Sequence, residues 1–325
     1  VDAWAVMSPE VYAEVPRLGR KDRLASRQRE ARWPVFESVR RTLKADGYLT
    51  WPSVFHAVAD HYKARSDKPF THIVIDEAQD LGVPELLMMT QIAAPSTDTL
   101  FFAGDLGQRI FQPPFSWKVL GADVRGRSTT LRVNYRTSHQ IRRAADALLP
   151  GIVRDGDGRE EDRRGTISVF DGPAPDIRLL ADKQQECVEV ASTLANWMAD
   201  GFLPQEIGIF VRSRAELPRA LAAIQAANFS AIELTGRENA ALDGISYGTM
   251  HLAKGLEFRG VIVMACDDGI LPLQERIDQV VDEADLDEVY ETERHLLYVA
   301  CTRARDRLLV TGIAPGSEFL GDLGR

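Results

Sequence analysis

Two adjacent carboxylates, Asp76 and Glu77, stand directly after a short apolar run in the stretch THIVIDEAQDL at residues 71–81. The run from His72 to Ile75 is typical of a strand that is buried on both faces of a parallel sheet, because crossover helices cover such sheets. Carboxylates at the carboxyl end of this strand would lie in the crevice where open α/β sheets bind ligands. Because two unpaired negative charges are costly to bury, we expect a positive partner, and a hydrated Mg²⁺ that carries nucleotide phosphates would serve.

The composition is that of an ordinary soluble protein, with 325 residues, 45% hydrophobic and 27% charged. This length is enough for two domains, and no segment has the ~18 uninterrupted apolar residues of a membrane span. Three cysteines, Cys187, Cys266 and Cys301, follow no metal-ligand spacing and indicate free thiols in a reducing compartment, which we expect to be the cytoplasm. The chain starts at Val1 without the pattern of a signal peptide, so we expect the native start to lie upstream.

Charge is distributed unevenly along the chain. The net charge is −9, but residues 275–293 hold nine acids and one arginine, so the remainder is close to neutral. Residues 17–32 carry seven basic and two acidic side chains. Both runs are explained by solvated helix faces, and the alternative is a surface for nucleic acid or a protein partner.

The order of predicted elements places these acids in an α/β protein. Residues 9–65 have helical patterns, and from residue 71 strands alternate with helices, which favours parallel sheets. The polar, glycine-rich segment 150–165 predicts a linker. We therefore expect a helical segment at 1–68, part of a first parallel-sheet domain at 69–150, and a second doubly wound domain at 151–325.

Four further segments join the acidic stretch: AGDLGQRIF at 103–111, LRVNYRTSHQI at 131–141, GTMHLAKGLEF at 248–258, and LLYVACTRARDRLLV at 296–310. Together and in this order, the five segments resemble motifs II, III, IV, V and VI of the UvrD/Rep-type superfamily 1 DNA helicases. The resemblance covers about three quarters of the chain. It implies two RecA-like parallel-sheet domains, the first incomplete, after an N-terminal helical segment.

The resemblance also implies roles in ATP hydrolysis. Asp76 would hold Mg²⁺ through water, and Glu77 would orient and deprotonate the water that attacks the γ-phosphate. Gln108 would sense the γ-phosphate, because its amide can both donate and accept hydrogen bonds. Arg136 and Arg303, expected at the edges of different domains, would be arginine fingers that bind phosphate oxygens with two donors each.

Other residues would hold the nucleotide or the nucleic acid. Tyr135 would stack on adenine, and Glu257 would contact the ribose or hold neighbouring motif residues. Phe111, Phe115 and Trp117 would stack on unpaired bases, although a hydrophobic plug beneath their loop explains the same rings. The remaining contacts, to the phosphodiester chain, are expected from Thr249, His251, Lys254 and the backbone amide of Gly255.

Three features depart from the family pattern. No Walker A sequence GxxxxGK[ST] is present, so we expect this chain to be a C-terminal portion of a longer helicase. Only residues 235–244 stand where the family has a large helical insertion called 2B, so we expect that subdomain to be absent. Arg109 follows Gln108 where the family usually has a small residue.

The leading hypothesis is an ATP- and Mg²⁺-dependent helicase or translocase that moves along single-stranded DNA, 3′ to 5′ as in the family, with this chain alone inactive. One alternative is a non-enzymatic module that binds nucleic acid or protein on a helicase scaffold. Another is an ATPase that remodels a protein partner.

Overall fold

The computed structural model describes residues 2–6, 8–14, 26–96, 98–105, 108, 115–124, 126–150, 152–154, 160–162, 165–236, 243–280 and 283–324. They fall into two compact units, one made of residues 1–129 with 154–160 and the other of residues 130–153 with 161–325. Among the described residues, no helix has the length and apolar character needed to cross a bilayer.

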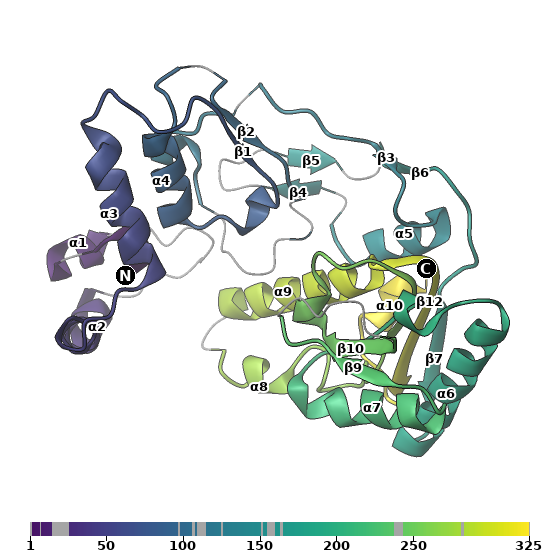
Figure 1. Cartoon of the computed structure of the whole chain (residues 1–325). Coiled ribbons are helices and arrows are strands. Elements are labelled where there is room, and N and C mark those ends of the chain that lie inside the picture. Colours follow the sequence, from purple (N-terminus) through teal and green to yellow (C-terminus); the bar gives the residue numbers. More distant parts are fainter. Residues whose placement is uncertain are drawn as a thin grey trace. The chain divides into compact units, whose positions relative to one another are not determined.

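The first unit combines helices with a short parallel sheet (Figure 1). Its helix α3 (Trp51–Lys63) begins after Thr50, whose side-chain oxygen accepts a hydrogen bond from Ser53 N. Helix α3 packs against α4 (Val83–Ile92). The other helical elements are η1 (Asp2–Trp4), α1 (Pro9–Glu14), α2 (Ser26–Ala45), η2 (Ala78–Asp80) and η4 (Lys118–Leu120). Helices α1, α2 and α3 agree with the helical pattern predicted for residues 9–65.

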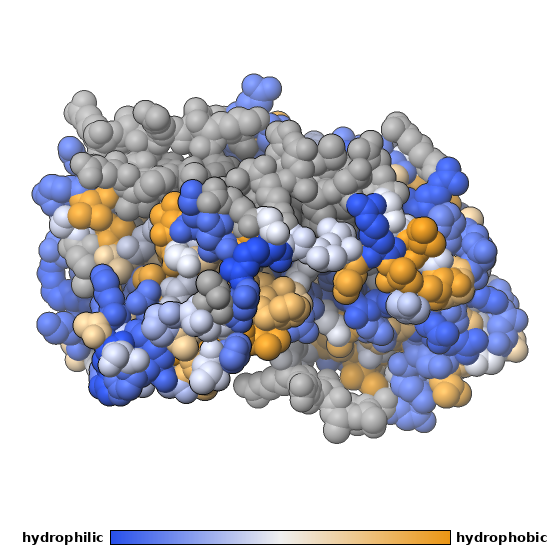
Figure 2. Space-filling model, turned by 90° about the horizontal axis from the view of Figure 1, so that it is seen from above, coloured by the Kyte–Doolittle hydropathy of each residue, from blue (hydrophilic) through white to orange (hydrophobic). Residues whose placement is uncertain are grey.

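Strands β1 (Ile73–Ile75) and β2 (Leu100–Phe102) form the sheet of the first unit, with Val74 opposite Phe101. Val74 is 73% exposed and Phe101 is 62% exposed, whereas Ile75 is buried. The prediction that this strand is buried on both faces is therefore wrong for the described residues, because the sheet has two strands and one of its faces stays open. In Figure 2, hydrophobic residues reach the surface as separate patches among hydrophilic ones.

The second unit is built on a six-stranded parallel sheet with the order β7-β12-β11-β8-β10-β9. Every residue of β8 is buried, as expected for a central strand that helices cover on both faces. The six strands are β7 (Asp176–Leu180), β8 (Ile207–Val211), β9 (Ala231–Glu233), β10 (Ile245–Thr249), β11 (Phe258–Val263) and β12 (Ala304–Ile313). This sheet confirms the predicted α/β class with parallel strands.

Helices cover both faces of this sheet (Figure 1). On one face, α6 (Lys183–Ala199) and α7 (Leu217–Ala226) contribute Leu194 and Ile224 to a core shared with Ile209 of β8. Helix α9 (Glu283–Cys301) and α5 (His139–Asp146) pack against each other and contact β12. The shorter helical elements of this unit are η6 (Pro204–Glu206), η7 (Arg214–Glu216), η8 (Met250–Ala253), α8 (Gln274–Ile277) and α10 (Leu320–Leu323).

The structure places residues 130–150 in the second unit, whereas the sequence predicted that they belong to the first domain. The reason is local packing, because Ser138 N donates to Arg305 O and Thr137 Oγ1 donates to Thr302 O. Ile141 is fully buried on α5. Strands β3 (Val133–Asn134) and β6 (Ile167–Ser168) pair in parallel beside this helix, and β4 (Ile152–Arg154) pairs with β5 (Glu160–Asp162).

Two other details concern the edges of the large sheet. Edge strand β7 has no clear apolar pattern in the sequence, because Asp176 and Arg178 lie within it. Arg178 pairs with Asp176 and with Glu189 of α6. At the other edge, β9 and β10 pair directly, with residues 234–244 between them. The expected absence of a 2B insertion stays a prediction, since residues 237–242 of this connection lie outside the described part of the chain.

Candidate functional site

Asp76 and Glu77 follow β1 at its carboxyl end, as the sequence predicted, and both side chains are exposed. Glu77 N donates a 2.8 Å hydrogen bond to Asp76 Oδ1. Glu77 adopts a left-handed backbone conformation with φ of 52° and ψ of 38°. A glutamate in this region of φ and ψ is strained, and such strain occurs frequently at functional sites.

A hydrogen-bond chain joins Glu77 to the end of the neighbouring strand. Gln79 Nε2 donates to Glu77 Oε2, and Gln79 Oε1 accepts a 3.0 Å hydrogen bond from Asp105 N. Gln108 Nε2 then donates a 2.9 Å hydrogen bond to Asp105 Oδ2. A Cβ atom at Gly104 would collide with Gln79 Oε1, so glycine permits this approach. The segments resembling motifs II and III therefore meet at one strand edge.

Sequence reasoning missed Gln79 and Asp105 as members of this site. Gln79 is only 5% exposed, although it lies between two acids in a polar stretch. A signal was present in the sequence, because AGD after the second strand places a glycine and an acid where the first strand carries its own acids. The burial of Gln79 depends on the parallel pairing of β1 and β2, which no local pattern specifies.

The residues at this strand edge fit a hydrated Mg²⁺ ion. Among the described residues, no group of three or more His, Cys, Asp or Glu side chains could hold a metal. Mg²⁺ does not need such a group, because it commonly binds one or two carboxylates and completes its shell with water and substrate phosphates. Asp76 supplies an exposed carboxylate of this kind, with one oxygen oriented by Glu77 N.

Arg136 and Tyr135 follow β3 in the second unit. Arg136 N donates a 2.9 Å hydrogen bond to Asn134 Oδ1, and Arg136 Nε lies 2.5 Å from Glu257 Oε1. Both side chains of this ion pair are about half exposed, so phosphate oxygens can compete with Glu257 for the guanidinium group. Tyr135 is 73% exposed and presents its ring to solvent.

Arg303 lies at the end of α9 and is 1% exposed. Its guanidinium donates to Val299 O at 3.0 Å and to Leu256 O at 3.4 Å. Both candidate arginine fingers therefore belong to the second unit, and the expectation that they lie in different domains is wrong. They contact the neighbouring residues Leu256 and Glu257, which places the segment after Gly255 between them.

The segment resembling motif V follows β10. Thr249 and Lys254 flank the 3₁₀ helix η8, and Gly255 has a φ of 78°, which suits glycine. Burial lowers the pKa of His251, and the positive charge of Arg212 lowers it further. The predicted phosphate-contact residues therefore lie together on one short turn at the carboxyl edge of the sheet.

The aromatic side chains predicted to stack on unpaired bases give a different result. Phe115 is 7% exposed and belongs to a core with Val83 and Leu86. The Trp117 ring packs edge-on against Phe102, with 4.7 Å between the ring centroids. For Phe115, the hydrophobic-plug alternative is therefore correct, because the ring fills space beneath the loop. Phe111 and Arg109 lie outside the described residues.

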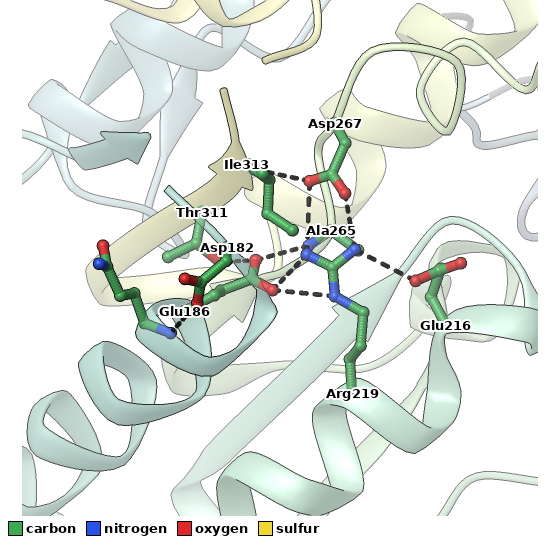
Figure 3. A network of polar contacts seen from close by, with 9 residues as sticks. Asp182, Glu186, Glu216, Arg219, Ala265, Asp267, Thr311 and Ile313 are labelled. Carbon is green, nitrogen blue, oxygen red and sulfur yellow. Dashed lines mark hydrogen bonds and ion pairs between the residues drawn. The ribbon is translucent and has the colours of Figure 1, made fainter. Parts of the chain in front are cut away.

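A buried ionic cluster also lies in the second unit (Figure 3). Arg219 pairs with Glu186, Glu216 and Asp267, and Glu186 Oε1 accepts hydrogen bonds from Thr311 Oγ1 and Ala265 N. Burial by itself lowers the pKa of Arg219, but the acidic partners outweigh this effect and raise the pKa. Because the cluster joins α6, α7 and the ends of β11 and β12, we interpret it as a structural centre.

Comparisons with known proteins find helicases among the similar sequences. Residues 218–314 match the UvrD-like helicase C-terminal domain family. DNA helicase IV of Escherichia coli K12 is 24% identical over 293 residues, which cover 85% of this chain and 39% of that protein. The chain thus spans about two fifths of the length of this relative.

Shorter stretches match other helicases. PcrA of Bacillus subtilis 168 is 34% identical over 85 residues, 26% of this chain and 11% of that protein. Rep of E. coli K12 is 40% identical over 76 residues, 23% of this chain and 10% of that protein.

A solved C-terminal domain of a possible DNA helicase from Lactobacillus plantarum WCFS1 is 23% identical and covers 58% of this chain and 94% of its own. Its TM-score is 0.41, too low to support a fold assignment, which rests on the sheet itself. The segments resembling motifs IV, V and VI lie together in the second unit, within which the family match falls. Within the second unit, residues 218–314 are therefore similar to the UvrD-like helicase C-terminal domain.

Proposed function

We propose that the chain is part of an ATP-dependent DNA helicase or translocase that moves 3′ to 5′ on single-stranded DNA. The observation that carries this proposal is the hydrogen-bond chain from Glu77 through Gln79 and Asp105 to Gln108. It joins a carboxylate suited to activating water with an amide suited to sensing a phosphate. The named relatives, which are DNA helicases, support the choice of DNA as the partner.

In the proposed mechanism, Asp76 would hold a hydrated Mg²⁺, which would neutralise phosphate charge. Glu77 orients and deprotonates the attacking water, while Gln108 reports whether the γ-phosphate is present. Arg136 would release Glu257 and bind phosphate oxygens instead. Arg303 would bind phosphate once its guanidinium leaves Val299 O and Leu256 O. Each guanidinium stabilises negative charge that develops on the transferred phosphoryl group.

The strand-binding part of the proposal concerns the turn Thr249–Lys254. Its hydroxyl, imidazole and ammonium groups would bind phosphates and would carry no base preference. Loss of the γ-phosphate would remove the phosphate contacts of Gln108 and Arg136. This change would alter the affinity of the turn for the strand. Trp117, which is partly exposed, stays a candidate for base stacking.

The test uses the complete gene product that contains this chain. Glu77→Gln is expected to lower ATP turnover by about 10²- to 10⁴-fold, the usual effect of removing a general base, while leaving nucleotide binding intact. Turnover is followed by phosphate release with single-stranded DNA present, and binding by a fluorescent nucleotide. Asp80→Asn is the matched control, since it removes a nearby acid that we expect to have a structural role in the loop and no role in catalysis. Turnover retained by Glu77→Gln would remove Glu77 from this role.

A further inference from the structure

We propose that Arg276 is an additional phosphodiester-contact residue, which Glu293 holds beside the turn Thr249–Lys254. This inference rests on the proposed function, because it adds a residue to the proposed strand-binding surface. Arg276 is the one arginine in the acidic run 275–293, and the sequence alone indicates no role for it. The structure gives it a defined position instead.

Two guanidinium groups share one buried carboxylate at this place. Glu293 is fully buried on α9, and its Oε1 accepts from Arg212 Nη2 at 2.5 Å and from Arg276 Nη1 at 3.0 Å. Its Oε2 also accepts from Arg212 Nε and from Leu273 N. The carboxylate thus fixes the position of Arg276 relative to the end of β8, from which Arg212 projects.

The two arginines differ in their access to solvent. The Arg212 side chain is 5% exposed and uses two of its nitrogens to bind Glu293, whereas the Arg276 side chain is 36% exposed and bonds Glu293 through Nη1. Arg212 therefore acts as the buried anchor. Arg276 keeps an accessible guanidinium surface that can bind a phosphate with charge-assisted hydrogen bonds.

The charge of the cluster is unbalanced. Two positive groups and one carboxylate leave an excess of one positive charge in a partly dehydrated place, which favours an anion nearby. The charges of the cluster also act on His251. Burial, Arg212 and Arg276 lower the pKa of this histidine, and only Glu293 opposes them. Helix α9, which carries Glu293, packs against η8 of the proposed strand-binding turn, so the cluster lies beside that turn.

Neighbouring acids limit the range of this field. Glu275 and Asp278 are exposed on the same short helix as Arg276, and Asp278 accepts a hydrogen bond from Gln274. Their two negative charges more than offset that of Arg276, and salt screens all three beyond a Debye length. Attraction by Arg276 must therefore act through direct contact with a phosphate, and it should appear as one contact in the salt dependence of binding.

The experiment measures binding of a fluorescent oligothymidine to the complete protein by anisotropy at several salt concentrations. Arg276→Gln is expected to weaken binding about 5- to 10-fold at low salt and to reduce the slope of log K against log salt by ~0.7, the value for one phosphate contact on a single strand. Arg178→Gln is the matched control, because it removes the same charge from edge strand β7. It should leave both quantities unchanged.

A second variant keeps the inference testable if Arg276→Gln is unstable. Glu275→Gln removes an exposed acid next to Arg276 and is expected to strengthen binding about 2- to 3-fold. Unchanged affinity in Glu275→Gln, or equal behaviour of Arg276→Gln and Arg178→Gln, overturns the inference. If Lys254→Gln weakens binding and Arg276→Gln does not, only this inference fails. If the unaltered protein does not bind the oligonucleotide, the proposed function fails with it.

Discussion

The strand edge of the first unit and the buried ionic clusters of the second unit use charged residues in opposite ways. Asp76 and Glu77 are exposed at the end of a two-stranded sheet, and Glu77 has a strained backbone. Glu186 and Glu293 are fully buried, and arginine side chains and backbone amides saturate their oxygens. Of these four acids, the two after β1 are therefore the ones that remain open to a ligand.

This difference separates chemistry from architecture. A buried carboxylate with arginine partners has no capacity left for a metal or a water molecule, and removal of one partner leaves an uncompensated charge. An exposed carboxylate next to a strained backbone contributes little to folding but can bind a ligand. Mutations in the two regions should consequently differ in the size and even the sign of their effects on stability.

The largest effect is expected for Arg219→Leu. Loss of this guanidinium leaves Glu186 and Asp267 without their shared cation, which should cost about 3–5 kcal/mol in the free energy of unfolding. Urea unfolding followed by tryptophan fluorescence measures this value, since Trp197 belongs to the hydrophobic core to which α7, the helix that carries Arg219, also contributes. Arg178→Leu removes an arginine that is 41% exposed and should cost about 1 kcal/mol or less. Equal costs would contradict the structural role of the cluster.

A change of sign is expected at Glu77. Because its φ is positive, Glu77→Gly should be more stable than Glu77→Ala by about 1 kcal/mol. At Val188, an exposed position within α6, the order should reverse and the glycine variant should be less stable than alanine by about 1 kcal/mol. Calorimetric unfolding of the four variants provides the comparison. A less stable glycine variant at position 77 would show that the backbone there is not strained.

The smallest effect concerns pH. The pKa of His251 is lowered in the folded protein, chiefly by burial and then by Arg212. Stability from this residue is therefore complete above its unfolded pKa of about 6.5 and is lost as pH falls through the lower folded value. The unfolding free energy of His251→Gln should depend less on pH below 6.5 than that of the unaltered protein.

Much of the fold could be predicted because the signals were local. Residues 83–92 and 283–301 form helices and residues 258–263 form a central strand, all within the region where the sequence predicted alternating strands and helices. Edge strand β7 was missed because paired charges at Asp176 and Arg178 hide its pattern. The buried state of Phe115 could not be predicted either, since an aromatic ring in a loop looks the same whether it fills a core or faces solvent.

The sequence by itself determined which chemical groups this protein offers and in what order: an acid pair, a glutamine, an arginine, a basic turn and a second arginine. Tertiary structure alone decided which of them are open. Glu293 meets Arg212, 81 positions away, and Glu186 meets Thr311, 125 positions away. The physical reason is that periodicity sets backbone conformation over a few residues, whereas the order of strands in the sheet determines which distant charges share one buried site.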